Sequence, residues 1–221
     1  MEKYYKAYDK RYKQIHKQGL SWAINNNTKI VDEIIIKYKL EKCKMLEIGC
    51  GEGRDSKYLL NKGYNLLATD VSKEAIKYCI DNDPIHKNNY KVLDVLKDSL
   101  NEKYDFIFSV ACIHMLVLDE DRKNYYKFTY NHLNDHGYSL ILSMGDGSFE
   151  SKSDITTAFN NVKRIHQETD KEVSIAATSC RIVNFDTLKK EVINNNFKII
   201  EYGITEIENH FNKIMYILIS K

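Results

Sequence analysis

Apolar and polar positions along the middle of the chain switch repeatedly between short apolar runs and helical spacing. Apolar runs of strand length, bounded by polar turns, predict strands at 44–49, 64–70, 89–95, 104–110 and 138–144. Amphipathic segments between them predict helices at 54–62, 72–80 and 121–133, with Ser72 and Asp119 as N-caps. Strands that alternate with helices predict a parallel sheet covered by helices on both faces.

The two ends of the chain depart from this alternation. Residues 2–18 carry tyrosines at four-residue spacing, which on a helix form one aromatic stripe, and a second helix is predicted at 28–38. At the other end, a helix at 185–196 is followed by strands at 197–207 and 213–220. Because a parallel pair needs a crossover of a dozen or more residues, these last two strands should pair antiparallel.

No repeat and no Pro- or Ser-rich linker divides the chain, so we expect one domain over residues 1–221. Its predicted parts are an N-terminal helical cap at 1–40, a core at 44–144, an insertion at 145–182 and a C-terminal helix and strand hairpin at 183–221. Long excursions such as the insertion often form lids or substrate loops in compact α/β domains.

Charge and cysteine content exclude several classes of protein. The 33 Lys and Arg residues nearly balance 31 Asp and Glu residues and are scattered, which argues against a nucleic-acid partner. No stretch is long and apolar enough to span a membrane, and the charged start lacks a secretory signal, so a cytoplasmic location is expected. The five cysteines form no CxxC pair, which predicts reduced thiols and no metal site. The sequence leaves the oligomeric state open.

A glycine-rich turn follows the first predicted strand of the core. The stretch EIGCGEG places Gly49, Gly51 and Gly53 at every second position before a helix, an arrangement that lets backbone amides approach a nucleotide. The dinucleotide pattern GxGxxG would need glycine at position 54, where the chain has Arg54. The spacing therefore argues against a dinucleotide cofactor.

Residues 45–144 resemble the class I S-adenosylmethionine-dependent methyltransferases, of the type that acts on small molecules. The segment LEIGCGEG is similar to the first motif of that family, and strands ending in LLATD and KVLD follow in order. The resemblance implies S-adenosyl-L-methionine as cofactor, with Asp70 on the ribose hydroxyls, Val71 against adenine, and Asp94 and the amide of Val95 on the adenine edge.

The same resemblance extends to the fold and to further cofactor residues. It implies a Rossmann-like, mostly parallel seven-stranded sheet with one antiparallel C-terminal strand. It also implies that the three glycines contact the adenosyl-methionine portion and that Glu47 orients its amino group. Ser109, at the end of the strand YDFIFSV, is expected beside the methyl-donating end.

The candidate general base is His114, about five residues beyond that strand, because a histidine pKa near 6.5 suits proton abstraction. Packing or capping of the next helix explains the same histidine equally well. The segment SVACIHML lacks the prolines of exocyclic-amine and base-carbon methyltransferases that act on nucleic acid. Cys112 in this segment is expected to be a small apolar packing residue.

Aromatic and basic residues outside the core are candidates for the walls of a pocket. We group Trp22 with the cofactor, and Tyr8, Tyr12 and Arg181 with the substrate, Arg181 as a partner for an anion. Packing roles for each of them remain open.

We therefore expect methyl transfer to the O, N or S atom of a small molecule in an enclosed pocket. The alternatives are a protein or RNA methyltransferase and a non-catalytic protein that binds S-adenosylmethionine.

Overall fold

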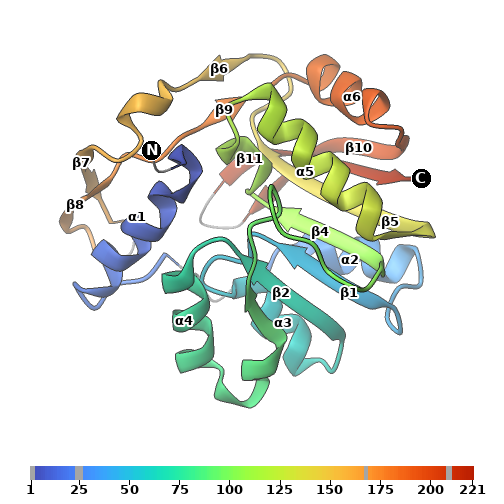
Figure 1. Cartoon of the computed structure of the whole chain (residues 1–221), viewed down its shortest axis with the longest axis horizontal. Coiled ribbons are helices and arrows are strands. Elements are labelled where there is room, and N and C mark those ends of the chain that lie inside the picture. Colours follow the sequence, from blue (N-terminus) through green and yellow to red (C-terminus); the bar gives the residue numbers. More distant parts are fainter. Residues whose placement is uncertain (1–2, 23–26, 167–168, 208–210) are drawn as a thin grey trace.

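The computed structural model describes residues 3–22, 27–166, 169–207 and 211–221. A seven-stranded sheet in the order β10-β11-β5-β4-β1-β2-β3 runs through the middle of the molecule (Figure 1). Its strands are β1 (Lys44–Ile48), β2 (Asn65–Asp70), β3 (Tyr90–Val92), β4 (Tyr104–Val110), β5 (Leu133–Met144), β10 (Lys198–Ile207) and β11 (Phe211–Ser220). Strand β11 runs opposite to the other six strands of this sheet, so the predicted fold class is confirmed. The link between β10 and β11 includes 208–210, outside the described residues.

Helices cover both faces of the sheet, as the alternation of strands and helices predicts. One face packs against the short turn η1 (Tyr4–Lys6) and against α5 (Asp119–His132) and α6 (Phe185–Asn194). The other face packs against α2 (Lys29–Lys37), α3 (Arg54–Asn61) and α4 (Lys73–Asn82). Short 3-10 turns lie at η2 (Pro84–Asn89), η3 (Ile113–Met115) and η4 (Ile155–Thr157).

The pleat of the central strands divides the core between the two faces. In β4, Ile107 packs in the cluster under α5 and α6, while Phe106 and Phe108 pack in the cluster under α2 and α3. All three side chains are fully buried. A strand buried on both faces reads as a continuous apolar run, which is why YDFIFSV could be assigned from the sequence.

The order in which strands are added to the sheet reverses between β1 and β4, and this reversal predicts where a ligand binds. From β1 the chain winds outward through β2 to β3, and it then returns to β4 on the other side of β1. Open α/β sheets bind ligands in the crevice that such a reversal leaves beyond the carboxyl ends of the strands. The glycine turn follows β1 and therefore lies at this crevice.

The insertion forms two small sheets beside the N-terminal helix. Strand β6 (Ser151–Lys152) pairs with β9 (Arg181–Ile182), and β7 (Asn161–Ile165) pairs with β8 (Glu172–Ala176). Figure 1 shows the β7–β8 hairpin next to helix α1 (Ala7–His16). Ile15 of α1 packs against Val173 and Ile175 of β8, so the insertion holds the helix from outside.

The two predicted helix caps have different outcomes. Ser72 caps α4, since its Oγ accepts a hydrogen bond of 3.1 Å from the backbone N–H of Ala75. The cap predicted at Asp119 is wrong: Asp119 is the first residue of α5, Leu118 is the N-cap, and no side chain caps this end. Asp119 instead forms an ion pair with Arg181 of β9.

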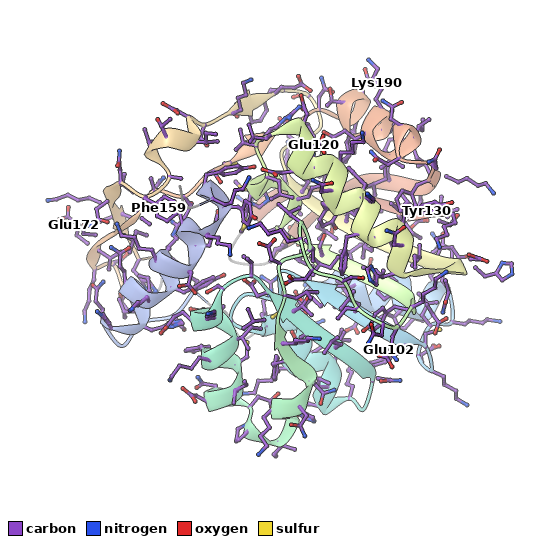
Figure 2. All side chains as sticks on the ribbon, viewed as in Figure 1. Glu102, Glu120, Tyr130, Phe159, Glu172 and Lys190 are labelled. Carbon is purple, nitrogen blue, oxygen red and sulfur yellow. The ribbon has the colours of Figure 1, made fainter. Side chains whose placement is uncertain are left out.

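The surface carries interspersed charges of both signs. Glu102, Glu120, Glu172 and Lys190 point away from the ribbon on different sides of the molecule (Figure 2). Within the part of the chain that the structure describes, no helix has the length and apolar character needed to cross a membrane.

Candidate functional site

The glycine turn is bound to the end of the neighbouring strand β2. The two carboxylate oxygens of Asp70 accept hydrogen bonds from the backbone N–H groups of Gly51, at 2.9 Å, and Ser72, at 2.8 Å. Burial raises the pKa of Asp70, while these N–H groups oppose the shift by favouring the ionised form. The carboxylate thus shapes the turn and still faces a cavity.

Close contacts explain why side chains are absent at two positions of the turn. A Cβ atom at Gly49 would lie 2.6 Å from Sγ of Cys112, and one at Gly51 would lie 2.7 Å from the hydroxyl of Tyr12. Both residues have positive φ angles, 75° and 55°, which glycine adopts without steric cost. The absence of side chains at Gly49 and Gly51 therefore makes room for the side chains of Cys112 and Tyr12.

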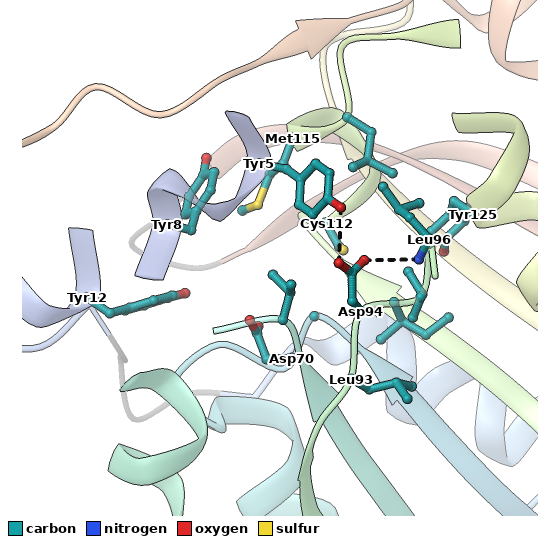
Figure 3. Close-up of a pocket in the computed structure, with 15 residues that line it drawn as sticks. Tyr5, Tyr8, Tyr12, Asp70, Leu93, Asp94, Leu96, Cys112, Met115 and Tyr125 are labelled. Carbon is teal, nitrogen blue, oxygen red and sulfur yellow. Dashed lines mark hydrogen bonds between the residues drawn. The ribbon is translucent and has the colours of Figure 1, made fainter. Parts of the chain in front are cut away.

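A small cavity lies beyond the carboxyl ends of β2 and β3. It has a volume of about 70 Å³, and Asp70, Val71, Asp94 and Val95 line it together, as the resemblance implied. Two hydrogen bonds hold Asp94: the hydroxyl of Tyr5 donates to it at 3.0 Å, and the N–H of Leu96 at 3.2 Å (Figure 3). Ligand pockets usually measure about 300–1,000 Å³, so this cavity is small. The side chain of Tyr5 occupies part of the space beside Asp94.

A larger cavity of about 490 Å³ adjoins the small one. Tyr8, Tyr12, Gly49 and Met115 line both, so the tyrosines of α1 lie between the two spaces. Figure 3 shows Tyr12 reaching from α1 toward Asp70. The larger cavity is also lined by Arg11, Trp22, Glu47, Gly51, His114 and Ile165.

Glu47 is buried at the wall of the larger cavity. Its carboxylate accepts a hydrogen bond from Oγ of Ser56 at 2.5 Å. Burial and the neighbouring charge of Asp55 raise the pKa of Glu47 to about 8. At pH 7 this carboxyl group is therefore mostly protonated until a cation comes close.

His114 lines the larger cavity from η3 and is only 3% exposed. Burial and the nearby Arg122 guanidinium lower the pKa of His114 to about 3. Among the described residues, its Nδ1 atom has no hydrogen-bond partner. The imidazole is therefore neutral at pH 7 and a weak base, although it lies where the sequence placed it.

Three predicted site residues lie outside the lining of these two cavities. Ser109 is fully buried and bonds to the hydroxyl of Tyr125 at 2.8 Å, behind the small cavity that Tyr125 lines. Gly53 is the N-cap of α3 and packs against Cys79. Arg181 donates hydrogen bonds to Asp119 and to the carbonyl oxygen of Val117, and it lines neither cavity.

The sequence did not single out Arg11 and Met115, which both line the larger cavity. Arg11 lies three residues after Tyr8 and four before Ile15, so it shares their helix face. That spacing was the available signal for Arg11. Nothing local in the sequence marks Met115, because its position depends on the path of η3.

Helix α1 closes the cavities through contacts at both of its ends. Near its start, Oδ1 of Asp9 accepts hydrogen bonds from Oγ of Ser72 and from the N–H of Glu74, at 2.8 and 3.0 Å. At its end, Nε2 of His16 lies 2.7 Å from Glu52 of the glycine turn, and Nδ1 lies 3.3 Å from Glu74. The helix is thereby tied to the elements that form the site.

The pKa of His16 reflects these two carboxylates. Burial lowers it, but the hydrogen bonds and charges of Glu52 and Glu74 outweigh burial, and the net shift is upward. The His16 ring also stacks on Tyr78 of α4, with ring centroids 4.6 Å apart. The contact between α1 and the site therefore depends on the charge of His16.

Comparison with known sequences gives one matching family. A family model described as tellurite resistance protein TehB matches residues 15–163, more than half of the chain. A probable S-adenosyl-L-methionine-dependent methyltransferase TehB from Haemophilus influenzae is 30% identical over 151 residues. The match covers 65% of this chain and 52% of that relative, so the chain spans about half the length of the curated relative.

Solved structures show the same fold at low sequence identity. An S-adenosylmethionine-dependent methyltransferase from Clostridium acetobutylicum superposes with a TM-score of 0.67 and 16% identity, covering 95% of each chain. The 1,6-didemethyltoxoflavin-N1-methyltransferase of Burkholderia thailandensis, solved with 1,6-didemethyltoxoflavin and S-adenosylhomocysteine, gives a TM-score of 0.68 at 13% identity. It covers 95% of this chain and 84% of its own.

Proposed function

Because the chain belongs to the TehB family of class I S-adenosylmethionine-dependent methyltransferases, we propose that it transfers a methyl group from S-adenosylmethionine to a small-molecule acceptor. One observation carries the proposal. Asp70 and Asp94, from neighbouring strand ends, line one cavity, and that cavity adjoins a larger one covered by α1. The first space marks the place of the adenosine, which needs Tyr5 to move aside, and the second has room for the methionine portion and the acceptor.

The residues around the cavities fit the parts of the cofactor. Asp70 would accept hydrogen bonds from the ribose hydroxyls, Asp94 would accept one from the adenine amine, and Glu47 would face the amino group of the methionine portion. All three carboxyl groups are at most 8% exposed, so their hydrogen bonds are protected from water. When bound, the cofactor would supply a methyl group bonded to a cationic sulfur; transfer of this methyl group to the acceptor would release S-adenosylhomocysteine.

In the larger cavity, we expect methyl transfer to be promoted by positioning of the acceptor and by partial shielding of the acceptor from water. Tyr8, Tyr12 and Trp22 form aromatic walls there, which can hold an acceptor against the methyl group and reduce its exposure to water. The role of His114 as a base stays a prediction. Because its pKa is low, His114 is a poor proton acceptor. It is better suited to orient the substrate, as a neutral ring that accepts a hydrogen bond from it.

The small-molecule assignment has support from the covered cavity and from one neighbour. The Burkholderia methyltransferase was solved with 1,6-didemethyltoxoflavin bound, and its fold matches most of this chain. The family description names tellurite resistance, which makes tellurite one acceptor to test. A protein or RNA acceptor would require an extended groove in place of a cavity beneath a helix. The cytoplasmic location expected from the sequence stays a prediction.

Formation of S-adenosylhomocysteine tests the proposal. The purified protein is incubated with S-adenosylmethionine and, in separate reactions, with phenols, amines, thiols, carboxylic acids, tellurite, bulk RNA and a denatured protein mixture. We expect acceptor-dependent product with at least one small molecule and none with RNA or protein. Product formed with RNA or protein but with no small molecule would show that the acceptor is a macromolecule. Cofactor binding without any product would support a non-catalytic binding protein.

A further inference from the structure

Arg11 is held in the wall of the larger cavity by contacts that leave much of its guanidinium group unused. Its Cζ atom lies 5.3 Å from the ring centroid of Trp22 and 5.9 Å from that of Tyr8. Nη1 donates a hydrogen bond of 3.0 Å to Oγ1 of Thr178. Two cation–π contacts and one hydrogen bond restrict the position of the group without neutralising its charge.

Thr178, which bonds Arg11, has an unusual backbone. It is a β-branched residue with φ of 64°, a conformation that costs free energy for any residue other than glycine, and it is 7% exposed. Such strain persists where the surrounding structure enforces it, often at ligand clamps. The insertion therefore presents this hydroxyl to Arg11 at a cost in stability.

Two further polar atoms of the same cavity lack partners. Nε1 of Trp22 and Nδ1 of His114 are buried, and neither has a hydrogen-bond partner among the described residues. An indole N–H can only donate, and an unmet buried donor is costly. The Trp22 ring, which lies in cation–π contact with Arg11, thus brings to the same wall a donor that has no partner among the described residues.

The acidic residues of the cavity are already engaged elsewhere. Asp55 accepts from the backbone and side chain of Thr28 and pairs with Arg54. Glu52 bonds His16 and the backbone N–H of Trp22. Glu47 is also bonded, to Ser56. Among the described residues of the wall, Arg11 and the exposed Arg164 are therefore the charged groups without an acidic partner, and Arg11 is the one beside Trp22.

We propose that Arg11 and Trp22 form a subsite in the larger cavity that binds a carboxylate. The guanidinium supplies charge and hydrogen-bond donors, and the indole N–H supplies a further donor, a combination suited to a planar anion. This inference rests on the proposed function, which offers two sources for the carboxylate. One is the methionine carboxylate of the cofactor, and the other is an acidic group on the acceptor.

Calorimetric titration with two cofactor analogues tests the first source. S-adenosylhomocysteine has the carboxylate, whereas 5′-methylthioadenosine lacks the whole amino-acid portion. If the subsite holds the cofactor, Arg11→Met weakens S-adenosylhomocysteine about 10- to 100-fold and Trp22→Phe about 2- to 10-fold, and both leave 5′-methylthioadenosine unchanged. Lys13→Met, an equal charge loss at an exposed position of α1, changes neither affinity.

Titration with benzoate, and with benzamide as its uncharged isostere, tests the second source in the presence and absence of S-adenosylhomocysteine. If the subsite holds the acceptor, the wild type prefers benzoate, Arg11→Met removes that preference, and S-adenosylhomocysteine affinity does not change. Thermal melts confirm that each variant is folded.

The proposal is overturned if neither variant changes S-adenosylhomocysteine binding and no Arg11-dependent benzoate binding is found. Equal weakening of both cofactor analogues also overturns it, because the variants would then disturb the adenosine site. Wild-type protein that binds neither analogue would contradict the proposed function instead. The carboxylate subsite would then be judged by the Arg11-dependent binding of benzoate.

Discussion

At the residue scale, burial sets the charges around the two cavities. Burial raises the pKa of Glu47 to about 8 and of the Cys112 thiol to about 12, and it lowers the pKa of His114 to about 3. Each of these groups is thus mainly uncharged at pH 7, and Cys112 acts as packing against Gly49, as expected. Binding of a cationic ligand can therefore change the protonation of the site, with Glu47 the first group to respond.

Asp70→Ala should weaken S-adenosylhomocysteine binding by about 1–3 kcal/mol, because buried ribose hydroxyls would lose a charged partner. Loss of the bond to the Gly51 N–H would add to the effect. Calorimetry of the variant measures it, with Asp81→Ala as a control, since Asp81 is an exposed residue of α4 that pairs with Lys77. Unchanged affinity in Asp70→Ala would remove Asp70 from the site.

Binding of S-adenosylhomocysteine at pH 7 should release up to about one proton, because the ammonium group of the ligand stabilises the ionised form of Glu47. The binding enthalpy, measured in buffers of different ionisation enthalpy, gives the number of protons. In Glu47→Gln the release should disappear. Equal proton release in this variant and the wild type would show that another group titrates.

At the scale of elements, α1 is the part whose position the site depends on most. The helix has only ten residues, too few to be stable alone, and its stability comes from contacts with the core and the insertion. His16 is the contact that responds to pH. A pKa raised in the folded state stabilises the fold below the unfolded value of about 6.5, and this contribution is lost as pH rises through the folded pKa.

His16→Gln should therefore lower the free energy of unfolding by about 1–2 kcal/mol at pH 6, and the difference from wild type should shrink by pH 9. Urea denaturation at a series of pH values measures this change. His136→Gln serves as the control, because His136 is exposed. A difference that stays constant or grows with pH would show that the charge of His16 does not hold α1.

At the scale of the whole molecule, the sheet and the meeting of Asp70 and Asp94 at one cavity could be predicted because their signals are local. Each core strand is a short apolar run, and Asp70 and Asp94 follow directly after such runs. The acceptor end depends on contacts between distant segments. Arg181 was expected to meet an anion but pairs with Asp119 of α5, and the place of Arg11 depends on Thr178 in the insertion.

A crystal structure of the protein with S-adenosylhomocysteine tests the central claim most directly. We predict adenine beside Asp94, the ribose on Asp70, and the sulfur facing the larger cavity beneath α1, with Tyr5 displaced to make room. Ligand bound away from Asp70 and Asp94, or a sulfur that faces open solvent instead of the larger cavity, would contradict the account.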